Sequence, residues 1–293
     1  MRIVEKSKIW FGLSIAVIVI GLFVGLINGF NMGIDFTGGT MMQINIGETI
    51  GVEEAKDITS QFALDADILH AGEEKQEIII KTKKDLDNKE REEIFNAFKE
   101  KYNLQDEDFR QAEQFGPTMG KEIAQKALLS IAIASIGMLA YITFRFEFKF
   151  GVAGIIALIH DVLVVVAIYG LFQIPLNSSL VAAVLTVVGY SINDTIVVFD
   201  RIRENLKFAK KPDYAGIANE SINQTLARSI NTSLTTLITI VTLYVLGVES
   251  IRQFALPLIA GIATGAYSSI FIASPIWVIW KNWEKGKGKY RPA

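Results

Sequence analysis

Four ionisable side chains lie inside long apolar stretches of this 293-residue sequence: His160, Asp161, Asp194 and Arg228. A charged side chain at the centre of a membrane-spanning helix costs about 2.5–3.5 kcal/mol on insertion scales, so such groups usually face a bundle interior or water and carry function. Asp194 lies in the segment GYSINDTIVVFDRIREN, six residues before the polar end of its apolar run, or roughly 9 Å along a helix. It is too deep in the run to serve as a helix cap.

Polar side chains close to Asp194 could hold either of its protonation states. Tyr190 and Ser191 precede it by four and three residues, on the same side of a helix, and Asn193 is its direct neighbour. A dry setting favours the neutral acid, whereas a nearby cation favours the ionised form. That balance is typical of a proton carrier, and Arg228 is the cation that we expect to pair with Asp194.

Arg228 begins a polar stripe on an apolar helix. Threonines follow it at spacings of four, three, four and three residues: Thr232, Thr235, Thr239 and Thr242. Such a stripe should face protein or water, and it could lead protons or ions to the Asp194–Arg228 pair. Two alternatives stay open. Arg228 could extend to the lipid head groups from the cytoplasmic end of its helix, and the hydroxyls could simply bond to their own backbone or join neighbouring helices.

His160 and Asp161 are adjacent and lie midway along the apolar stretch 151–173, where they could bond to each other. They could transfer protons directly, or they could tie their helix to the small residues of its neighbours. We expect the second role, in which this pair supports the polar centre around Asp194.

The residue types argue against metal and enzyme chemistry. The sequence has no cysteine and only two histidines, His70 and His160, so a thiolate site and a histidine-rich metal site are excluded. It also lacks a P-loop, an HExxH helix and a nucleophile elbow. We therefore expect no enzymatic activity, no metal, no cofactor and no nucleic-acid partner. Protons, or alternatively sodium ions, are the expected coupling ions.

The elements that must position these side chains are apolar segments of membrane-spanning length. Hydrophobic residues make up 51% of the chain, and about 18 consecutive apolar residues are enough to cross a bilayer. Six segments meet or nearly meet this length, at about 9–29, 124–144, 151–173, 178–200, 228–248 and 254–280. The first is longer than a signal-peptide core and lacks a cleavage pattern, so we expect a retained anchor. The predicted organisation is a first transmembrane helix (1–29), an extracytoplasmic α+β domain (30–120), and five further helices with cytoplasmic loops and tail (121–293).

Charge predicts the orientation of these segments. Residues 30–123 contain 21 acidic and 11 basic side chains. The two ends of the chain and the short connections FRFEFKF and DRIRENLKFAKK are instead rich in lysine and arginine. By the positive-inside rule, the basic segments face the cytoplasm. An even number of spans then places both termini in the cytoplasm and the acidic segment outside.

The acidic segment has the pattern of a separately folded domain. Alternating strands and amphipathic helices are predicted in the order β-α-β-β-α-β, at 40–46, 52–62, 65–71, 77–82, 88–103 and 108–115. This order matches the ferredoxin-like arrangement. Its surplus acid is interpreted as a solvated face, with a docking surface for a basic or unfolded polypeptide as the alternative. His70 is expected to be a strand or loop residue.

Five motifs together resemble the SecF family, the smaller subunits of the bacterial SecD–SecF protein-export complex within the RND superfamily. They are GIDFTGGT, FGPTMG, HDV in the third span, GYSINDTIVVFDRIREN and LARSINTSLTT. The likeness spans the whole chain, and it implies a six-helix RND-type transmembrane bundle with one outer domain. In the family motif, the acid of NDT and the arginine of the fifth span are the proton-relay residues, and they fall on Asp194 and Arg228. The usual Arg-Thr of the fifth span is Arg-Ser here, which retains a hydroxyl.

The resemblance also implies partners and an energy source. It places the chain beside SecD and the SecYEG translocon in the bacterial cytoplasmic membrane, in contact with translocating preprotein and membrane lipid. It implies that the proton-motive force, and not ATP, helps to complete export. The relay of the family includes an aspartate from the fourth span of SecD, which this chain does not contain.

The expected function is therefore that of a subunit in a proton-motive-force-driven complex that assists the Sec translocon. One alternative is a structural subunit that only scaffolds SecD and conducts no ions. Another is a component of an RND-type small-molecule efflux system, although such transporters have twelve spans and two large outer domains in one chain.

Overall fold

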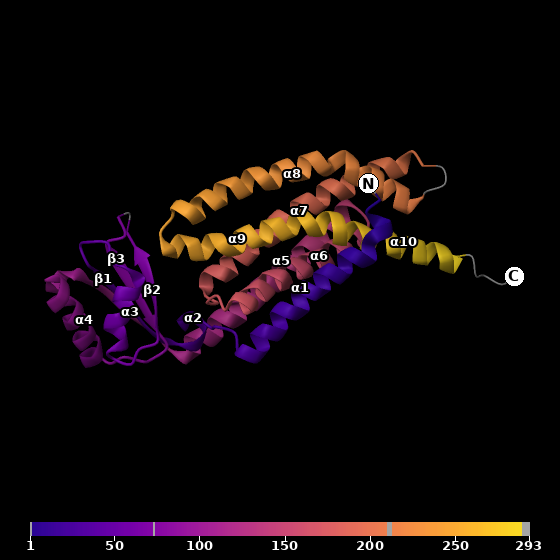
Figure 1. The fold of residues 1–293 in the computed structure, drawn as a ribbon. Helices are drawn as coiled ribbons and strands as arrows, with labels where there is room; N and C mark the ends of the chain where they lie inside the picture. The colour runs from indigo at the N-terminus through magenta and orange to yellow at the C-terminus, as the bar shows by residue number, and fades with distance from the viewer. Residues whose placement is uncertain (1, 73, 210–212, 289–293) are drawn as a thin grey trace.

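The computed structural model describes residues 2–72, 74–209 and 213–288, and its long helices run side by side with a small α+β domain beyond one end (Figure 1). Six helical spans in the described residues are long and apolar enough to cross a membrane. They are formed by α1 (Ser7–Asn28), α5 (Pro117–Arg145), α6 (Phe148–Phe172), α7 (Ser178–Lys207), α8 (Tyr214–Leu246), and a last span built from α9 (Glu249–Ser268), the π-helical segment η3 (Ser269–Ala273) and α10 (Ser274–Gly288). The predicted membrane fold is confirmed.

The helices α7 and α8 extend beyond the apolar segments seen in the sequence. α8 begins at Tyr214 and not at the predicted residue 228. Its first turns are amphipathic, because Ala218 and Ile222 are fully buried among the apolar side chains of the bundle while Gly216, Glu220 and Gln224 are exposed. A mixed face lowers the mean hydropathy of this region, so an apolar run does not reveal it. Arg228 consequently lies in the interior of a helix.

Both ends of the described chain lie at the same end of the bundle. The start of α1 and the end of α10 are opposite the sheet domain (Figure 1). A short 3₁₀ turn, η1 (Val4–Lys6), precedes α1. There the side chain of Asn219 in α8 accepts hydrogen bonds from the backbone N–H groups of Ile3 and Val4, at 2.8 and 3.1 Å. The amino-terminal segment is thereby attached to the helix that carries Arg228. Predicted features of residues 210–212 and 289–293, parts of the basic segments, lie outside the described residues.

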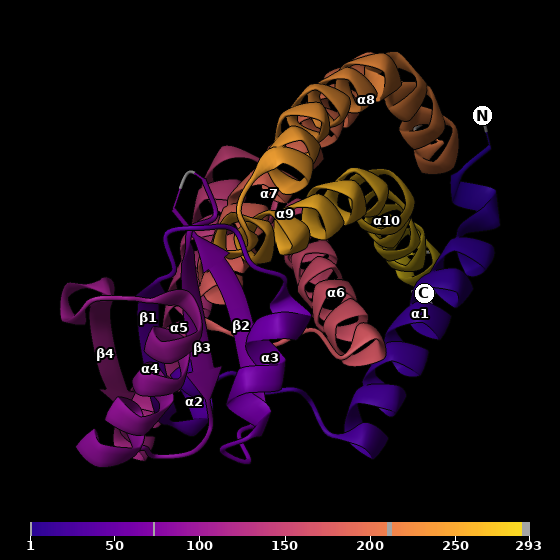
Figure 2. The ribbon, with the colours of Figure 1, turned by 60° about the vertical axis from the view of Figure 1, so that its left-hand side comes forward.

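Close helix contacts position the remaining spans. α1 packs against α6, and α8 packs against α7 and α9 (Figure 2). Gly21 of α1 has no room for a side chain, since a Cβ atom there would lie 2.3 Å from the carbonyl oxygen of Ala167. Further toward the termini, the rings of Phe150 and Trp277 stack with their centroids 4.8 Å apart. These contacts fix the rotation of α6 and the last span around the polar centre described below.

The outer domain, defined here as residues 39–115, is a four-stranded antiparallel sheet with helices on one face (Figure 2). Its elements are β1 (Gly39–Asn45), α3 (Val52–Ser60), β2 (Ala66–Ala71), β3 (Glu77–Thr82), α4 (Asn88–Tyr102), the 3₁₀ turn η2 (Asp106–Asp108) and β4 (Phe109–Phe115). The strand order is β2-β3-β1-β4, which is the order of a ferredoxin-like fold. Alternate residues of β1 and β3, such as Met42, Ile44, Ile78 and Ile80, form the core beneath the helices.

The first span is joined to this sheet by a single short helix, α2 (Ile34–Thr37). It occupies IDFT within the motif GIDFTGGT. β1 begins two residues later, at Gly39. The register pairs Gly39 with Phe115 at the end of β4. Both chain connections of the outer domain therefore lie side by side.

Candidate functional site

Asp194 is buried at the interface of α7 and α8. Its residue is only 3% exposed, and the Ser233 hydroxyl of α8 donates a hydrogen bond to Asp194 Oδ2 at 3.3 Å. Ser229, one helical turn before Ser233, is also buried on this face of α8, and its hydroxyl has no hydrogen-bond partner among the described residues. The acid is thus held inside the bundle, as the cost of exposing a carboxylate to hydrocarbon predicts. We call Asp194, Ser229, Ser233 and Arg228 the Asp194 site.

Arg228 acts on Asp194 through its charge and not through contact. The guanidinium favours the ionised carboxylate electrostatically, but the two groups, both within the described chain, form no direct ion pair. The direct pair expected from the sequence is therefore corrected. The reason is helical geometry: Ser229 and Ser233 share the face of α8 that meets α7, and Arg228 lies one residue, or about 100°, around the helix.

Arg228 borders an open cavity between α5, α7 and α8. The cavity has a volume of about 510 Å³ and lies at the end of the bundle that holds the two chain ends. Asn193 also borders it, next to Asp194 in the sequence. Its remaining charged lining comes from Arg145, Asp200, Arg201 and Glu204. The cavity brings polar side chains, and room for water, to the edge of the Asp194 site.

Tyr190 and Ser191 point to different sides of α7. The Tyr190 hydroxyl donates to the backbone oxygen of Thr232 at 2.9 Å and bonds to Thr236 Oγ1 at 2.7 Å, which joins α7 to α8. Ser191 donates to Asp161 at 2.6 Å. Neither contacts Asp194 as the sequence spacing suggested, because residues three and four positions earlier lie about 60° and 40° away, on opposite sides.

The threonine stripe lies on the outer side of α8. Thr235, Thr239 and Thr242 are exposed, and Thr232 is half-buried. Each hydroxyl donates to a backbone carbonyl of its own helix, at distances from 2.8 to 3.2 Å. The stripe therefore faces out of this chain. Its hydroxyls bond to the backbone of their own helix, which is the alternative to an ion path given above. It forms no path to Asp194 through this chain's own interior.

Asp161 lies at the centre of a second polar group, the Asp161 cluster, formed by His160, Asp161, Ser191 and Ser268. Asp161 is fully buried. His160 Nδ1 lies 3.0 Å from its Oδ1, and Ser191 and Ser268 donate to its Oδ2 at 2.6 and 2.8 Å. These bonds connect α6, α7 and α9. The predicted His160–Asp161 contact is present.

The Asp161 cluster adjoins the only irregular turn of the described last span. The π-helical segment η3 starts directly after Ser268, and the hydroxyls of Thr195 in α7 and Ser269 in η3 bond at 2.9 Å. Such π-helical turns often occur at functional sites. Thr195 follows Asp194 in the sequence, so α7 connects the two polar groups through adjacent residues.

Several residues of these sites were not found from the sequence. Ser229 and Ser233 are one position beyond members of the threonine stripe, and their spacing of four residues was a usable signal for a shared helix face. Ser268 carried no such signal, because its role depends on a helix far away in the chain. Within residues 2–72, 74–209 and 213–288, no group of three or more acidic or histidine side chains could hold a metal ion.

Comparisons with known proteins match nearly the whole chain. The family model "Protein export membrane protein SecD/SecF, C-terminal" matches residues 95–283, and "SecD/SecF GG Motif" matches residues 23–48. The protein translocase subunit SecF of Alicyclobacillus acidocaldarius is 38% identical over 286 residues, which cover 96% of this chain and 92% of that protein. The SecDF subunit of Bacillus subtilis is 37% identical over 287 residues, which cover 97% of this chain but 38% of that longer protein.

Solved structures show the same likeness. The crystal structure of SecDF from Thermus thermophilus superimposes with a TM-score of 0.82 at 35% identity, covering 96% of this chain and 39% of that one. A second structure, of SecDF in a super-membrane-facing form, gives a TM-score of 0.75 at 34% identity. In both cases the chain spans less than half of the solved protein.

Proposed function

Because this chain belongs to the SecF branch of the SecD/SecF protein-export family, we propose that it uses ion movement through the Asp194 site to assist protein export. It is a multi-pass bacterial membrane protein, and its relatives are named as translocase subunits. The energy source proposed is the proton-motive force, with sodium ions as the alternative coupling ion.

The observation that carries the proposal is the buried carboxylate of Asp194 between two membrane helices. Burial disfavours the ionised form of this carboxylate, whereas the Ser233 hydroxyl and the charge of Arg228 favour it. Binding one proton removes the attraction to the charge of Arg228 and weakens the hydrogen bond from Ser233. A single proton therefore changes the contacts between α7 and α8, whose other hydrogen bonds run through Tyr190 and, farther along α7, through Arg201 and Asn205.

The cycle follows from these contacts. A proton that arrives from the outer side neutralises Asp194, and the attraction to Arg228 is lost. α7 and α8 then shift relative to each other, and the proton leaves through the cavity that Arg228 and Asn193 border. A tenfold proton gradient, or about 60 mV, provides roughly 1.4 kcal/mol per proton. That is enough to shift the populations of two helix arrangements about tenfold.

SecD is the proposed partner of the exposed face of α8. Arg228 and the exposed threonines would meet hydrocarbon if nothing covered this face, and polar side chains in a membrane usually face protein or water. The SecDF relatives carry additional sequence beyond the part that this chain matches. The relay is completed, in this proposal, by an acid from SecD. SecYEG and the translocating preprotein are the further proposed partners, and both termini are placed in the cytoplasm.

The decisive experiment replaces Asp194 by asparagine in the complex with SecD. Export of a preprotein into membrane vesicles is measured with and without a proton gradient. Asp194→Asn should abolish the part that depends on the gradient and leave the rest unchanged. Glu220→Gln, which neutralises an exposed acid of α8, is the matched control and should retain both parts. Full gradient dependence in Asp194→Asn would exclude the proposal.

A structural subunit is the second candidate. It is favoured by the threonine hydroxyls, which all bond to their own helix backbone, and by the lack of a direct Asp194–Arg228 ion pair within the described chain. A scaffold should conduct no ions. Proton or sodium flux through the purified complex in liposomes, measured with and without Asp194→Asn, separates the two candidates.

A further inference from the structure

The segment that leads from α1 into the outer domain is connected by backbone pairing to the residues just before α7. The N–H of Gly33 donates to the carbonyl of Leu176 at 2.7 Å, and the N–H of Leu176 donates to the carbonyl of Asn31 at 2.8 Å. Met32 and Leu176 thereby form a parallel bridge. Gly33 is required at this contact, since a Cβ atom there would lie 2.7 Å from the oxygen of Leu176.

Asp35 adds a contact to the first residue of α7. Its Oδ2 accepts a hydrogen bond of 2.7 Å from the backbone N–H of Ser178. The first N–H groups of a helix have no partner inside the helix, and a negative charge at this end is favoured by the helix dipole. The local cap, Asn177, serves a different group, the N–H of Leu180. α7 is thus capped twice, once by its own chain and once from the segment that leads into the outer domain.

The helix α2 that carries Asp35 is held from the opposite side by α5. A Cβ atom at Gly120 of α5 would lie 2.2 Å from the carbonyl oxygen of Phe36, so the two backbones are in direct contact. β1 starts two residues after α2, and Gly39 is paired with Phe115, which leads into α5. Any displacement of α2 is therefore passed to both chain connections of the outer domain.

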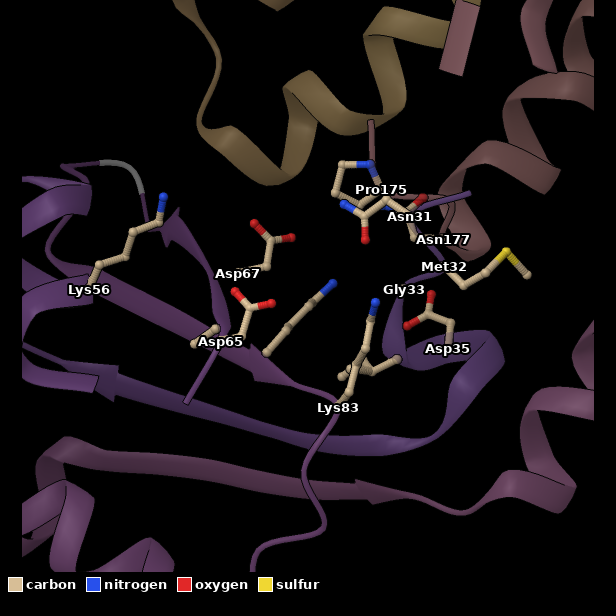
Figure 3. Close-up of a pocket in the computed structure, with 13 residues that line it drawn as sticks. Asn31, Met32, Gly33, Asp35, Lys56, Asp65, Asp67, Lys83, Pro175 and Asn177 are labelled. Carbon is tan, nitrogen blue, oxygen red and sulfur yellow. The ribbon is translucent and has the colours of Figure 1, made fainter. Parts of the chain in front are cut away.

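A polar cavity leaves room for such a displacement. It has a volume of about 240 Å³ and lies between the sheet and the segment before α7, with Asp35, Asp65, Lys83 and Asn177 in its lining (Figure 3). Gly38 and Gly39 follow α2 with positive φ angles of 83° and 142°, which suits a pivot. β2 also lies against α9, so the outer domain meets the bundle at a place other than the segment that carries Asp35.

We propose that Asp35 is a positioning residue that couples the outer domain to the helix of Asp194. α7 is one continuous helix from Ser178 to Asp194, about 24 Å long, and it moves as a rod. When Asp194 changes its protonation state, the shift of α7 reaches α2 through the Asp35–Ser178 bond, and from there it tilts the outer domain. This inference rests on the proposed function of Asp194.

The coupling is tested by distances in the complex with SecD, reconstituted in liposomes with an imposed pH gradient. This chain contains no cysteine, so introduced cysteines place spin labels at defined positions in it. One pair, Glu113→Cys and Phe172→Cys, reports the outer domain against the outer end of α6. A second pair, the inner pair, is Phe144→Cys and Phe208→Cys. It reports the distance between the carboxyl-terminal ends of α5 and α7. All four positions are exposed.

Two substitutions remove the same hydrogen bond from its two ends. Asp35→Ala removes the acceptor. Ser178→Pro removes the donor, and proline is tolerated at the first position of a helix, while the extended Asn177 suits the position before proline. Both should abolish the gradient-dependent change in the outer pair and retain it in the inner pair. The double variant should do no more than either single one.

The control is Asp65→Ala, which removes an exposed acid of the same cavity and should leave both distance changes intact. Asp35→Asn, which keeps an acceptor oxygen but no charge, should give a partial loss and guards against misfolding of the alanine variant. If the gradient-dependent distance change in the outer pair survives in both Asp35→Ala and Ser178→Pro, the coupling through Asp35 is excluded. The proposed function of Asp194 is not affected by that result. If the unaltered complex shows a gradient-dependent change in neither pair, the proposed function fails and the coupling with it.

Discussion

The Ser233 hydroxyl on α8 and the Asp194 carboxylate on α7 lie 3.3 Å apart and join two membrane helices through one long hydrogen bond. Hydroxyl-to-oxygen hydrogen bonds in proteins are usually 2.5–3.0 Å long, so this bond is longer than usual and weak. Such a contact holds the acid in place and is easily broken. Both properties suit a group that must gain and lose a proton.

Replacing Ser233 by alanine should weaken coupling without removing it. The ionised form of Asp194 loses the hydrogen bond from Ser233 but keeps the charge of Arg228 nearby. The loss of one hydrogen bond is worth about 1 kcal/mol, or roughly a fivefold change in the gradient-dependent export rate. Ser130→Ala, at an exposed serine of α5, is the control. An unchanged rate in Ser233→Ala would show that this contact has no part in coupling.

Arg228 should be replaceable by lysine. It acts on Asp194 through charge, and the described residues form no two-pronged guanidinium contact between them. Arginine and lysine differ most where such a contact exists. Arg228→Lys should therefore retain most of the gradient-dependent export, and Arg228→Gln should lose it. Equal loss in the two variants would mean that the guanidinium itself is required, as in a direct contact with a partner acid.

Asp161 should matter for the stability of the bundle. Three donors from three helices converge on its carboxylate. Asp161→Leu leaves them unsatisfied at a cost of about 1–3 kcal/mol for each buried group. Asp161→Asn keeps one acceptor oxygen and should lower the thermal unfolding temperature less. The measurement is thermal unfolding of the purified protein, with Asp57→Asn, at an exposed acid of α3, as the variant expected to unfold like the parent.

Gly21 should not accept even a methyl group. The added Cβ would lie 2.3 Å from the backbone oxygen of Ala167, so α1 would have to move away from α6. Overpacking of this kind costs about 1–3 kcal/mol. Gly12 on the same helix has nothing within 4 Å, which makes Gly12→Ala a matched control. A thermal unfolding temperature lowered equally by the two substitutions would point to helix propensity or lipid contact instead of helix packing.

The outer domain should become less stable at acid pH, in part through Glu54. Hydrogen bonds from Lys101 and Tyr102, each 2.9 Å long, hold the pKa of Glu54 below its ordinary value of 4.5. A lowered pKa in the folded state adds stability above pH 4.5, and that stability is lost as the pH falls through the folded-state value. The protection of outer-domain amides against hydrogen exchange in the full chain, taken relative to the intrinsic rate at each pH from neutral pH to pH 3, should therefore fall at the acid end.

The substitution Glu54→Gln isolates this contribution. It should remove the part of the acid response that belongs to Glu54 and make the pH dependence of exchange shallower. Glu53→Gln, at the neighbouring and more exposed residue, should leave the pH dependence as it is in the parent. Identical pH profiles for the parent and Glu54→Gln would show that the Lys101 and Tyr102 contacts do not stabilise the fold.

The sequence by itself determined the membrane spans and the fold of the outer domain. Six apolar runs can satisfy their backbone hydrogen bonds in a bilayer only as helices, and the alternation of Met42, Ile44, Ile78 and Ile80 places one face of each strand in a core. The sequence also singled out Asp194, because burying an acid in an apolar helix is costly wherever that helix lies. These conclusions rest on the local composition and on the regular spacing of apolar residues.

Only the tertiary structure decided which polar groups meet. Ser191 lies three residues from Asp194 in the sequence but bonds to Asp161, and Ser233 takes the contact expected of Arg228. Asp35, which the sequence did not single out, caps a helix 143 positions away in the chain. Such pairings depend on how each helix is rotated and how close its neighbours approach. Rotation and approach are set by side-chain packing between distant segments, such as Gly21 against Ala167, and not by the local pattern.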